Sequence, residues 1–187
     1  MRRLHWNTTL ELAAQAWTEG CDFQHNYGTD YGENLSAQPY FYNGSEALLG
    51  WYSEIAYYDY TTNSCSDGHI CGHYTQLVLE ESSNVGCGIY FCRTMKTITM
   101  TNGYFIACFY SPATNKGSSV PYKNGPVCSS CLAGLGCVDG LCDEESPMKV
   151  KDPKCPSLVG FPKVLFVSGS QLCREVKSNQ TETATTP

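Results

Sequence analysis

One short stretch of the sequence brings together residue types that could do chemistry. Between Cys71 and Gly88, in CGHYTQLVLEESSNVGCG, His73 follows a glycine and precedes a tyrosine, with cysteines on either side. An imidazole can transfer protons, bind a metal ion, or hold a hydrogen bond in a structural network. The residues elsewhere in the chain must decide among these three roles.

The cysteines indicate disulfide bonds and an oxidising compartment. The chain of 187 residues holds twelve cysteines, an even number, and cytosolic proteins rarely carry so many. The first residues, MRRLHWNTTLELAAQAW, lack the apolar core and cleavage site of a secretory signal. A cytosolic protein and a secreted protein whose start is missing both fit this beginning. The cysteines favour the secreted, extracellular protein.

Two other sequence features bear on partners. The net charge is −6, whereas proteins that bind nucleic acid usually carry a basic surface. We therefore expect no nucleic-acid partner. No apolar run reaches the roughly 18 residues that a membrane-spanning helix needs, so we expect no transmembrane segment. Triplets of the form Asn-X-Ser/Thr begin at Asn7, Asn43 and Asn179 and could carry glycans.

Two amphipathic helices are predicted in the first third of the chain. Residues 8–21 place apolar side chains at three- and four-residue steps, with Thr8 or Thr9 as the cap. A loop rich in glycine and tyrosine follows. Ser45 is then the expected cap of a second helix. Its predicted apolar stripe consists of Leu48, Trp51, Ile55 and Tyr58.

The pattern changes to strands from Val85 onward. VGCGIYFC reads as one strand, and TITM-TNG-YFIACFY reads as a hairpin with Asn102-Gly103 at its tip, because Asn-Gly readily adopts the positive φ angles of a tight turn. Helices followed by a hairpin sheet predict an α+β fold with an antiparallel sheet.

Beyond Pro121 the chain becomes rich in cysteine and poor in large apolar residues. CSSCLAGLGCVDGLC cannot build a core of its own, so disulfides must hold it; a zinc site is the alternative interpretation of its paired cysteines. Cys155 and Cys173 could close a loop around FPKVLFV, and SNQTETATTP reads as a disordered, Thr-rich tail.

Two motifs stand out: GHYTQLV, residues 72–78, which is followed by Leu79, and YFIACFYSPATN, which contains Phe109 and Thr114. They resemble signatures of the CAP superfamily, which includes cysteine-rich secretory proteins, antigen 5 and pathogenesis-related proteins. In that family a tryptophan, an asparagine and a glycine are usual where this chain has Leu79, Phe109 and Thr114. CDFQHN, YGENLS and WYSEIAYYDY extend the likeness over about residues 1–142. The cysteine spacing after Pro121 is similar to the hinge of glioma-pathogenesis-related and CRISP-type animal proteins.

The resemblance implies a three-layer α-β-α sandwich and a domain order. We expect a CAP domain over 1–122, a cysteine-rich hinge over 123–142, a disulfide-closed extension over 143–175 and a tail over 176–187. The family's first helix would precede Met1, so the domain is expected to be N-terminally truncated, and the missing helix is expected to leave one face of the sheet exposed.

Disulfide pairs follow from the same resemblance. It implies three pairs in the main domain: Cys21–Cys92, Cys65–Cys71 and Cys87–Cys108. For the remaining cysteines we predict Cys128–Cys137, Cys131–Cys142 and Cys155–Cys173, although spacing alone leaves the hinge connectivity open.

The resemblance also implies a cleft lined by two imidazoles and two carboxylates. Carried onto this chain, the set is His25, Glu33, Glu54 and His73. It could hold Zn²⁺ or another divalent cation, with the histidines as direct ligands and the glutamates orienting them. General acid–base catalysis and a purely structural polar network are the alternatives.

An aromatic loop and one serine complete the candidate site residues. Trp51, Tyr57, Tyr58 and Tyr60 could line a lipid- or sterol-binding slot, or Trp51 could belong to the core while the tyrosines cover a sheet edge. Ser36 is the nearest candidate nucleophile for a protease, but no nucleophile motif surrounds it, and Asn34-Leu35-Ser36 is equally a glycosylation triplet.

The sequence therefore predicts a secreted protein that acts by binding a lipid, a sterol or an extracellular protein surface. It is not expected to be an enzyme. A sterol carrier, a CRISP-like channel-modulating toxin and a protease are the alternative functions.

Overall fold

A computed structural model describes residues 1–113 and 120–143 of the chain. The expected Cys155–Cys173 pair, the extension and the tail lie outside these residues, apart from Asp143. Among the helices that the structure describes, none has the length and apolarity needed to cross a membrane.

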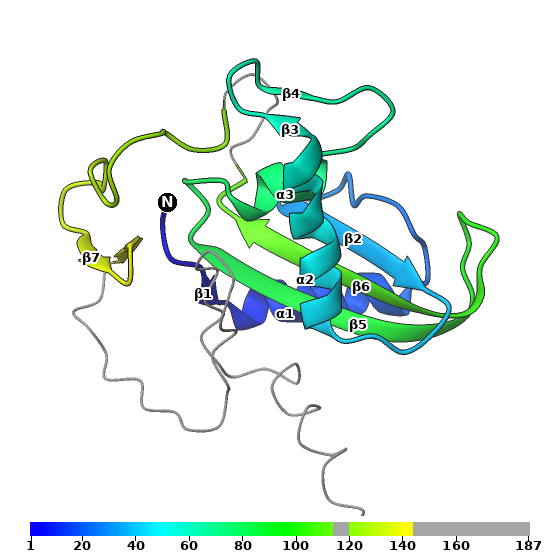
Figure 1. Cartoon of the computed structure of the whole chain (residues 1–187). Coiled ribbons are helices and arrows are strands. Elements are labelled where there is room, and N and C mark those ends of the chain that lie inside the picture. Colours follow the sequence, from blue (N-terminus) through cyan, green and yellow to red (C-terminus); the bar gives the residue numbers. More distant parts are fainter. Residues whose placement is uncertain (114–119, 144–187) are drawn as a thin grey trace, which may run out of the picture.

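Four strands form the central sheet. Their order is β1 (His5–Trp6), β5 (Asn84–Thr94), β6 (Thr101–Ser111) and β2 (Gly32–Gln38). The three long strands pair antiparallel, as predicted, and the short β1 adds a parallel edge to β5. Helix α1 (Thr8–Glu19) lies behind the sheet, and α2 (Gly44–Ser53) and α3 (Gly72–Leu77) lie in front of it (Figure 1). The predicted three-layer α+β sandwich is confirmed.

Smaller elements complete the described chain. After α2 come a 3₁₀ turn, η1 (Glu54–Tyr57), and a two-stranded ribbon of β3 (Tyr58–Asp59) and β4 (Ser64–Cys65). A second ribbon, β7 (Gly136–Val138) and β8 (Leu141–Asp143), forms in the cysteine-rich segment.

Strand β6 is buried on both faces. Because side chains alternate along a strand, Phe105, Ala107 and Phe109 join the core under α1, where all three are fully buried. The alternate residues, Ile106, Cys108 and Tyr110, join the core under α2 and α3 and are at most 4% exposed. The expectation that one face of the sheet is open is therefore wrong for this strand, since helices cover both sides.

Two glycines let α1 approach β5 closely. A Cβ added at Gly86 would lie 2.1 Å from the backbone nitrogen of Glu11, and one added at Gly88 would lie 2.4 Å from Cα of Gln15. The helix backbone occupies the space that side chains would take, so any larger residue must displace α1.

The hairpin differs from its prediction. Asn102-Gly103 lies inside β6, with Gly103 paired to Cys92, and the chain reverses instead between Thr94 and Thr101. Asn102 does adopt a positive φ of 54°, so it has the backbone conformation expected of a turn residue although it lies within a strand. Local preference for a turn was overridden by the longer run of pairing between β5 and β6.

Both helix caps also differ from their predictions. The Asn7 side chain caps α1 by accepting from the backbone nitrogens of Thr9 and Leu10. Asn43 caps α2, and Glu46 returns a bond to the backbone nitrogen of Asn43, which completes a capping box. Asparagine satisfies the free N–H groups at a helix start as well as serine or threonine does.

The predicted stripe of the second helix is interrupted. Trp51 is 4% exposed and lies in the core, whereas Ile55 is 41% exposed. The α-helix ends at Ser53 and continues as a 3₁₀ turn into β3, which contains Tyr58. The change in residues per turn moves Ile55 off the buried face, whereas Tyr58 still packs against the core that contains Trp51.

Five disulfides link the described cysteines, and none of these cysteines is free. The pairs coincide with those named from the sequence for this part of the chain: Cys21–Cys92, Cys65–Cys71, Cys87–Cys108, Cys128–Cys137 and Cys131–Cys142. Cys87–Cys108 joins directly paired residues of β5 and β6, so it links these two central strands covalently.

Buried tyrosines predict a loss of stability at alkaline pH. Burial raises the pKa of Tyr42 to about 12 and also raises the pKa of Tyr110. Above about pH 10 the unfolded chain releases these protons while the folded protein retains them, so rising pH favours unfolding. We expect the melting temperature to fall between about pH 9 and 11, and to fall less steeply in Tyr110→Phe.

Tyr27→Phe is the matched control for this measurement, because Tyr27 is 89% exposed. Its melting temperature should follow the pH dependence of the unchanged protein. A melting temperature that stays constant over this range would contradict the prediction.

Candidate metal and recognition site

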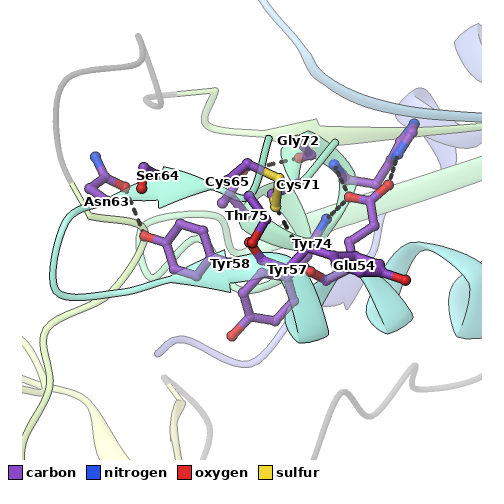
Figure 2. The surroundings of a disulfide bond; sticks show 12 residues. Glu54, Tyr57, Tyr58, Asn63, Ser64, Cys65, Cys71, Gly72, Tyr74 and Thr75 are labelled. Atoms are coloured by element: carbon purple, nitrogen blue, oxygen red, sulfur yellow. Dashed lines mark hydrogen bonds and ion pairs between the residues drawn. A yellow bond between two sulfur atoms is a disulfide. The ribbon is translucent and has the colours of Figure 1, made fainter. Parts of the chain in front are cut away.

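Glu54 organises the start of α3. Its carboxylate, 8% exposed as a residue, accepts from the backbone nitrogens of His73 and Tyr74 at 3.0 and 3.1 Å. The same carboxylate contacts Nδ1 of His73 at 2.5 Å. Figure 2 shows Glu54 below this turn, beside the Cys65–Cys71 disulfide. Glu54, which directly follows α2, therefore caps α3 and also orients the imidazole of His73.

His73 is held on its flank as well as at Nδ1. Its ring stacks on the Trp51 indole, with centroids 6.1 Å apart and planes 19° apart. The Trp51 N–H donates to the Leu35 carbonyl of β2, which anchors the indole in the core. With Nδ1 on the carboxylate and one ring face on Trp51, the Nε2 edge of this 25% exposed side chain remains available.

His25 and Glu33 form a second pair of the same kind. Nδ1 of His25 lies 2.9 Å from the Glu33 carboxylate, which also accepts from the backbone nitrogen of Asn26. Glu33 is 6% exposed at its side chain, whereas the His25 side chain is 55% exposed. The buried glutamate thus fixes the loop before β2 and leaves the imidazole facing solvent.

The two pairs are near the same end of β2. Asn34 donates to the His73 carbonyl at 3.1 Å, and a Cβ at Gly32 would meet the Gln76 side chain of α3 at 2.4 Å. These two residues flank Glu33, so β2 connects one pair to the helix that carries the other. Within residues 1–113 and 120–143, however, no three His, Cys, Asp or Glu side chains are grouped closely enough to hold a metal ion.

The four aromatic side chains proposed for a lipid slot make different contacts within the protein. Trp51 is a core residue. Tyr57 stacks on His69, Tyr58 donates to the Asn63 side chain, and Tyr60 donates to the Tyr122 carbonyl (Figure 2 shows the first two tyrosines). Tyr60 also stacks on the Tyr122 ring, 5.0 Å away, so it fastens this loop to the segment that follows residue 119.

Ser36 lies within β2, opposite Ile106. Among the hydrogen bonds of the described residues, none joins its hydroxyl to a histidine. The arrangement of nucleophile and base that a serine hydrolase needs is therefore not formed by Ser36 in the described part of the chain.

A polar cluster elsewhere was missed by the sequence reasoning. Arg3, 8% exposed, pairs through Nε with Asp143 at 2.8 Å and through a terminal nitrogen with Asp139 at 3.0 Å. His5 lies 3.1 Å from the other Asp143 oxygen. Backbone bonds from Arg3 to Cys142 and from Cys142 to Met1 reinforce the contact. The first residues and the cysteine-rich segment are thereby joined, and no local pattern reveals a contact between such distant positions.

Comparison with known proteins places this chain in a family. The model of the cysteine-rich secretory protein (CAP) family matches residues 1–110, which is more than half of the chain. The chain belongs to the cysteine-rich secretory protein family, as the sequence motifs predicted.

Individual relatives agree with this assignment. Glioma pathogenesis-related protein 1 of Mus musculus is 36% identical over 76% of this chain and 55% of its own length. Peptidase inhibitor 16 of Mus musculus is 33% identical over 81% of this chain and 31% of its own length. The chain thus spans about half of one relative and about a third of the other. The solved structure of BmVAL-1 is 28% identical, with a TM-score of 0.61 over 76% of this chain and 77% of that one.

Proposed function

We propose that this chain is a secreted binding protein that acts by recognition rather than turnover, with His25 and His73 able to take a divalent cation such as Zn²⁺. One observation carries the proposal: each imidazole has Nδ1 on a buried glutamate, which leaves Nε2 as the available nitrogen. A carboxylate on one ring nitrogen is the usual companion of a metal on the other, because it fixes the tautomer and the ring orientation.

The donor set limits what such a site could be. Two imidazoles without a third protein ligand leave the coordination shell to be completed by water or by a bound partner. Recognition that depends on a cation would follow, since the ion could bridge the protein to a ligand on an extracellular surface. The name of one relative, peptidase inhibitor 16, is consistent with action by binding another protein.

Zinc titration tests the proposal. Isothermal titration of Zn²⁺ into metal-stripped, oxidised full-length protein should show micromolar binding, and His25→Ala combined with His73→Ala should abolish it. His69→Ala is the matched control and should bind as the unchanged protein does, because His69 stacks on Tyr57 and belongs to neither pair. Equal binding by the double variant would contradict the assignment of these ligands.

Thermal melting of the same variants separates metal binding from a structural role. A double variant that has lost zinc but melts near the temperature of the unchanged protein supports a binding site. If no zinc binds to any of the proteins and the double variant melts much earlier, the His–Glu pairs are a structural network, and the metal proposal fails.

The sterol-carrier alternative has weaker support. The hydroxyls of Tyr58 and Tyr60 are both engaged within the protein, with Asn63 and Tyr122 as their acceptors. Tyr58→Ser together with Tyr60→Ser should abolish sterol binding if this loop captures sterol, and should leave zinc binding unchanged. The toxin alternative depends on residues after 143, outside the described part of the chain.

A further inference from the structure

Three Asn-X-Ser/Thr triplets lie within the described residues, and their asparagines have different environments. The triplets are Asn7-Thr8-Thr9, Asn34-Leu35-Ser36 and Asn43-Gly44-Ser45. An N-linked glycan is attached to the side-chain nitrogen, Nδ2, and must project from the surface. The surroundings of each Nδ2 therefore decide which triplets the folded protein can carry in glycosylated form.

Asn34 is incompatible with a glycan. Its residue is fully buried, and its Nδ2 donates to the His73 carbonyl at 3.1 Å and to the Tyr110 hydroxyl at 3.4 Å. A sugar on this nitrogen would break both bonds and would need space that the buried Tyr110 ring fills. A chain modified at this position could not form the contact between β2 and α3.

Asn7 and Asn43 are compatible with a glycan because each uses only its side-chain oxygen. Oδ1 of Asn7 accepts from Thr9 and Leu10 at 2.9 and 3.1 Å. Oδ1 of Asn43 accepts from Ser45 and Glu46 at 2.9 and 3.1 Å. Both asparagines are partly exposed, and neither Nδ2 has a hydrogen bond among the described residues. Attachment at Nδ2 retains Oδ1, so both helix caps would survive the modification.

We propose that Asn7 and Asn43 are N-glycosylation sites and that Asn34 stays unmodified. The donor is a lipid-linked oligosaccharide diphosphate of the secretory pathway. In the transfer, the bond between sugar C1 and the diphosphate oxygen breaks and a bond from C1 to Nδ2 forms. Nδ2 loses one proton, the lipid diphosphate leaves, and no redox change occurs. The proposal requires passage through the secretory pathway but does not depend on the metal site.

Peptide mass spectrometry of secreted protein tests the proposal. The full chain, placed behind a cleavable secretion signal, is expressed in mammalian cells and treated with peptide N-glycosidase F in heavy-oxygen water. Asn7 and Asn43 should be converted to labelled aspartate, whereas Asn34 should be recovered as asparagine. The proposal would be overturned if Asn7 or Asn43 carried no detectable label. It would also be overturned if Asn34 were labelled.

Matched variants remove each triplet without touching its cap. Thr9→Ala should abolish the glycan at Asn7 only, and Ser45→Ala should abolish the glycan at Asn43 only. In both variants the asparagine oxygen and the backbone N–H donors remain, so the helices should still be capped and the protein should still be secreted. Ser36→Ala should leave the glycan pattern unchanged, and a lost glycan in that variant would contradict the exclusion of Asn34.

Discussion

Replacing Gly86 with alanine is expected to destabilise the domain by about 2–4 kcal/mol. The new methyl group would lie 2.1 Å from the backbone nitrogen of Glu11 and 2.6 Å from the carbonyl carbon of Leu10. Because these obstacles are backbone atoms of α1, no side-chain rotation can relieve the clash, and the helix must move off the sheet. Urea unfolding measured by circular dichroism would give the change in the free energy of unfolding.

Gly50→Ala is the matched control for this prediction. Gly50 lies within α2, and a Cβ added there would meet nothing within 4 Å. Alanine in a helix interior is favoured over glycine by about 0.5–1 kcal/mol, so this variant should be slightly more stable than the unchanged protein. Similar destabilisation in both variants would show that the close packing of α1 on β5 is not the cause.

Replacing Arg3 with methionine is expected to lower the free energy of unfolding by about 3 kcal/mol, because it removes one partner of a buried ion pair while the other stays buried. The guanidinium pairs with Asp143, which is 7% exposed, and also donates to the Val138 carbonyl at 3.2 Å. We expect faster hydrogen exchange at the backbone amide of Cys142, which bonds to the Met1 carbonyl. The cysteine-rich segment would then separate from the sheet more readily.

Two further variants distinguish the buried pair from charge in general. The Lys123 side chain is 72% exposed, and its amino group lies 3.8 Å from the Glu80 carboxylate. Lys123→Met should therefore change the free energy of unfolding by less than about 1 kcal/mol. Arg3→Met combined with Asp143→Leu should recover part of the loss, because the buried carboxylate that faced the guanidinium is removed too. If the two substitutions acted independently, the double variant would lose as much free energy of unfolding as the two single variants lose together. That result would contradict this account.

Much of the fold was predictable because its signals are local. YFIACFY is a short, continuous run of apolar and aromatic residues, and it correctly indicates a strand, which the structure shows to be β6, buried on both faces. The helix over 8–21 was predicted to within two residues, since its apolar spacing has the α-helical period. The family motifs added the layer order, which spacing alone does not provide.

Other features could not be predicted, since they depend on competing or distant interactions. Asn-Gly at 102–103 favours a turn locally, but the pairing of Thr101 and Gly103 with β5 holds this dipeptide in a strand. The choice of Asn43 over Ser45 as a cap depends on where the helix packs, because both residue types cap equally well. The contact of Arg3 with Asp143 joins opposite ends of the described chain, so it leaves no periodic signal.

The candidate site was predicted in part. The sequence resemblance named His25, Glu33, Glu54 and His73, and the structure brings them together as two His–Glu pairs rather than as one group of ligands. It did not reveal that Glu54 also caps α3 through two backbone bonds. That second role comes from the packing of η1 against α3, which only the folded arrangement shows.

The central claim is that His25 and His73 present Nε2 while a carboxylate holds Nδ1. Long-range ¹⁵N–¹H correlation spectra of the imidazoles in the oxidised full-length protein, recorded during Zn²⁺ titration, test it most directly. We predict that the Nε2 resonances of His25 and His73 shift while their Nδ1 atoms stay protonated, and that His5 and His69 do not respond. Zinc-induced changes at Nδ1, or at His5 and His69 instead, would contradict the account.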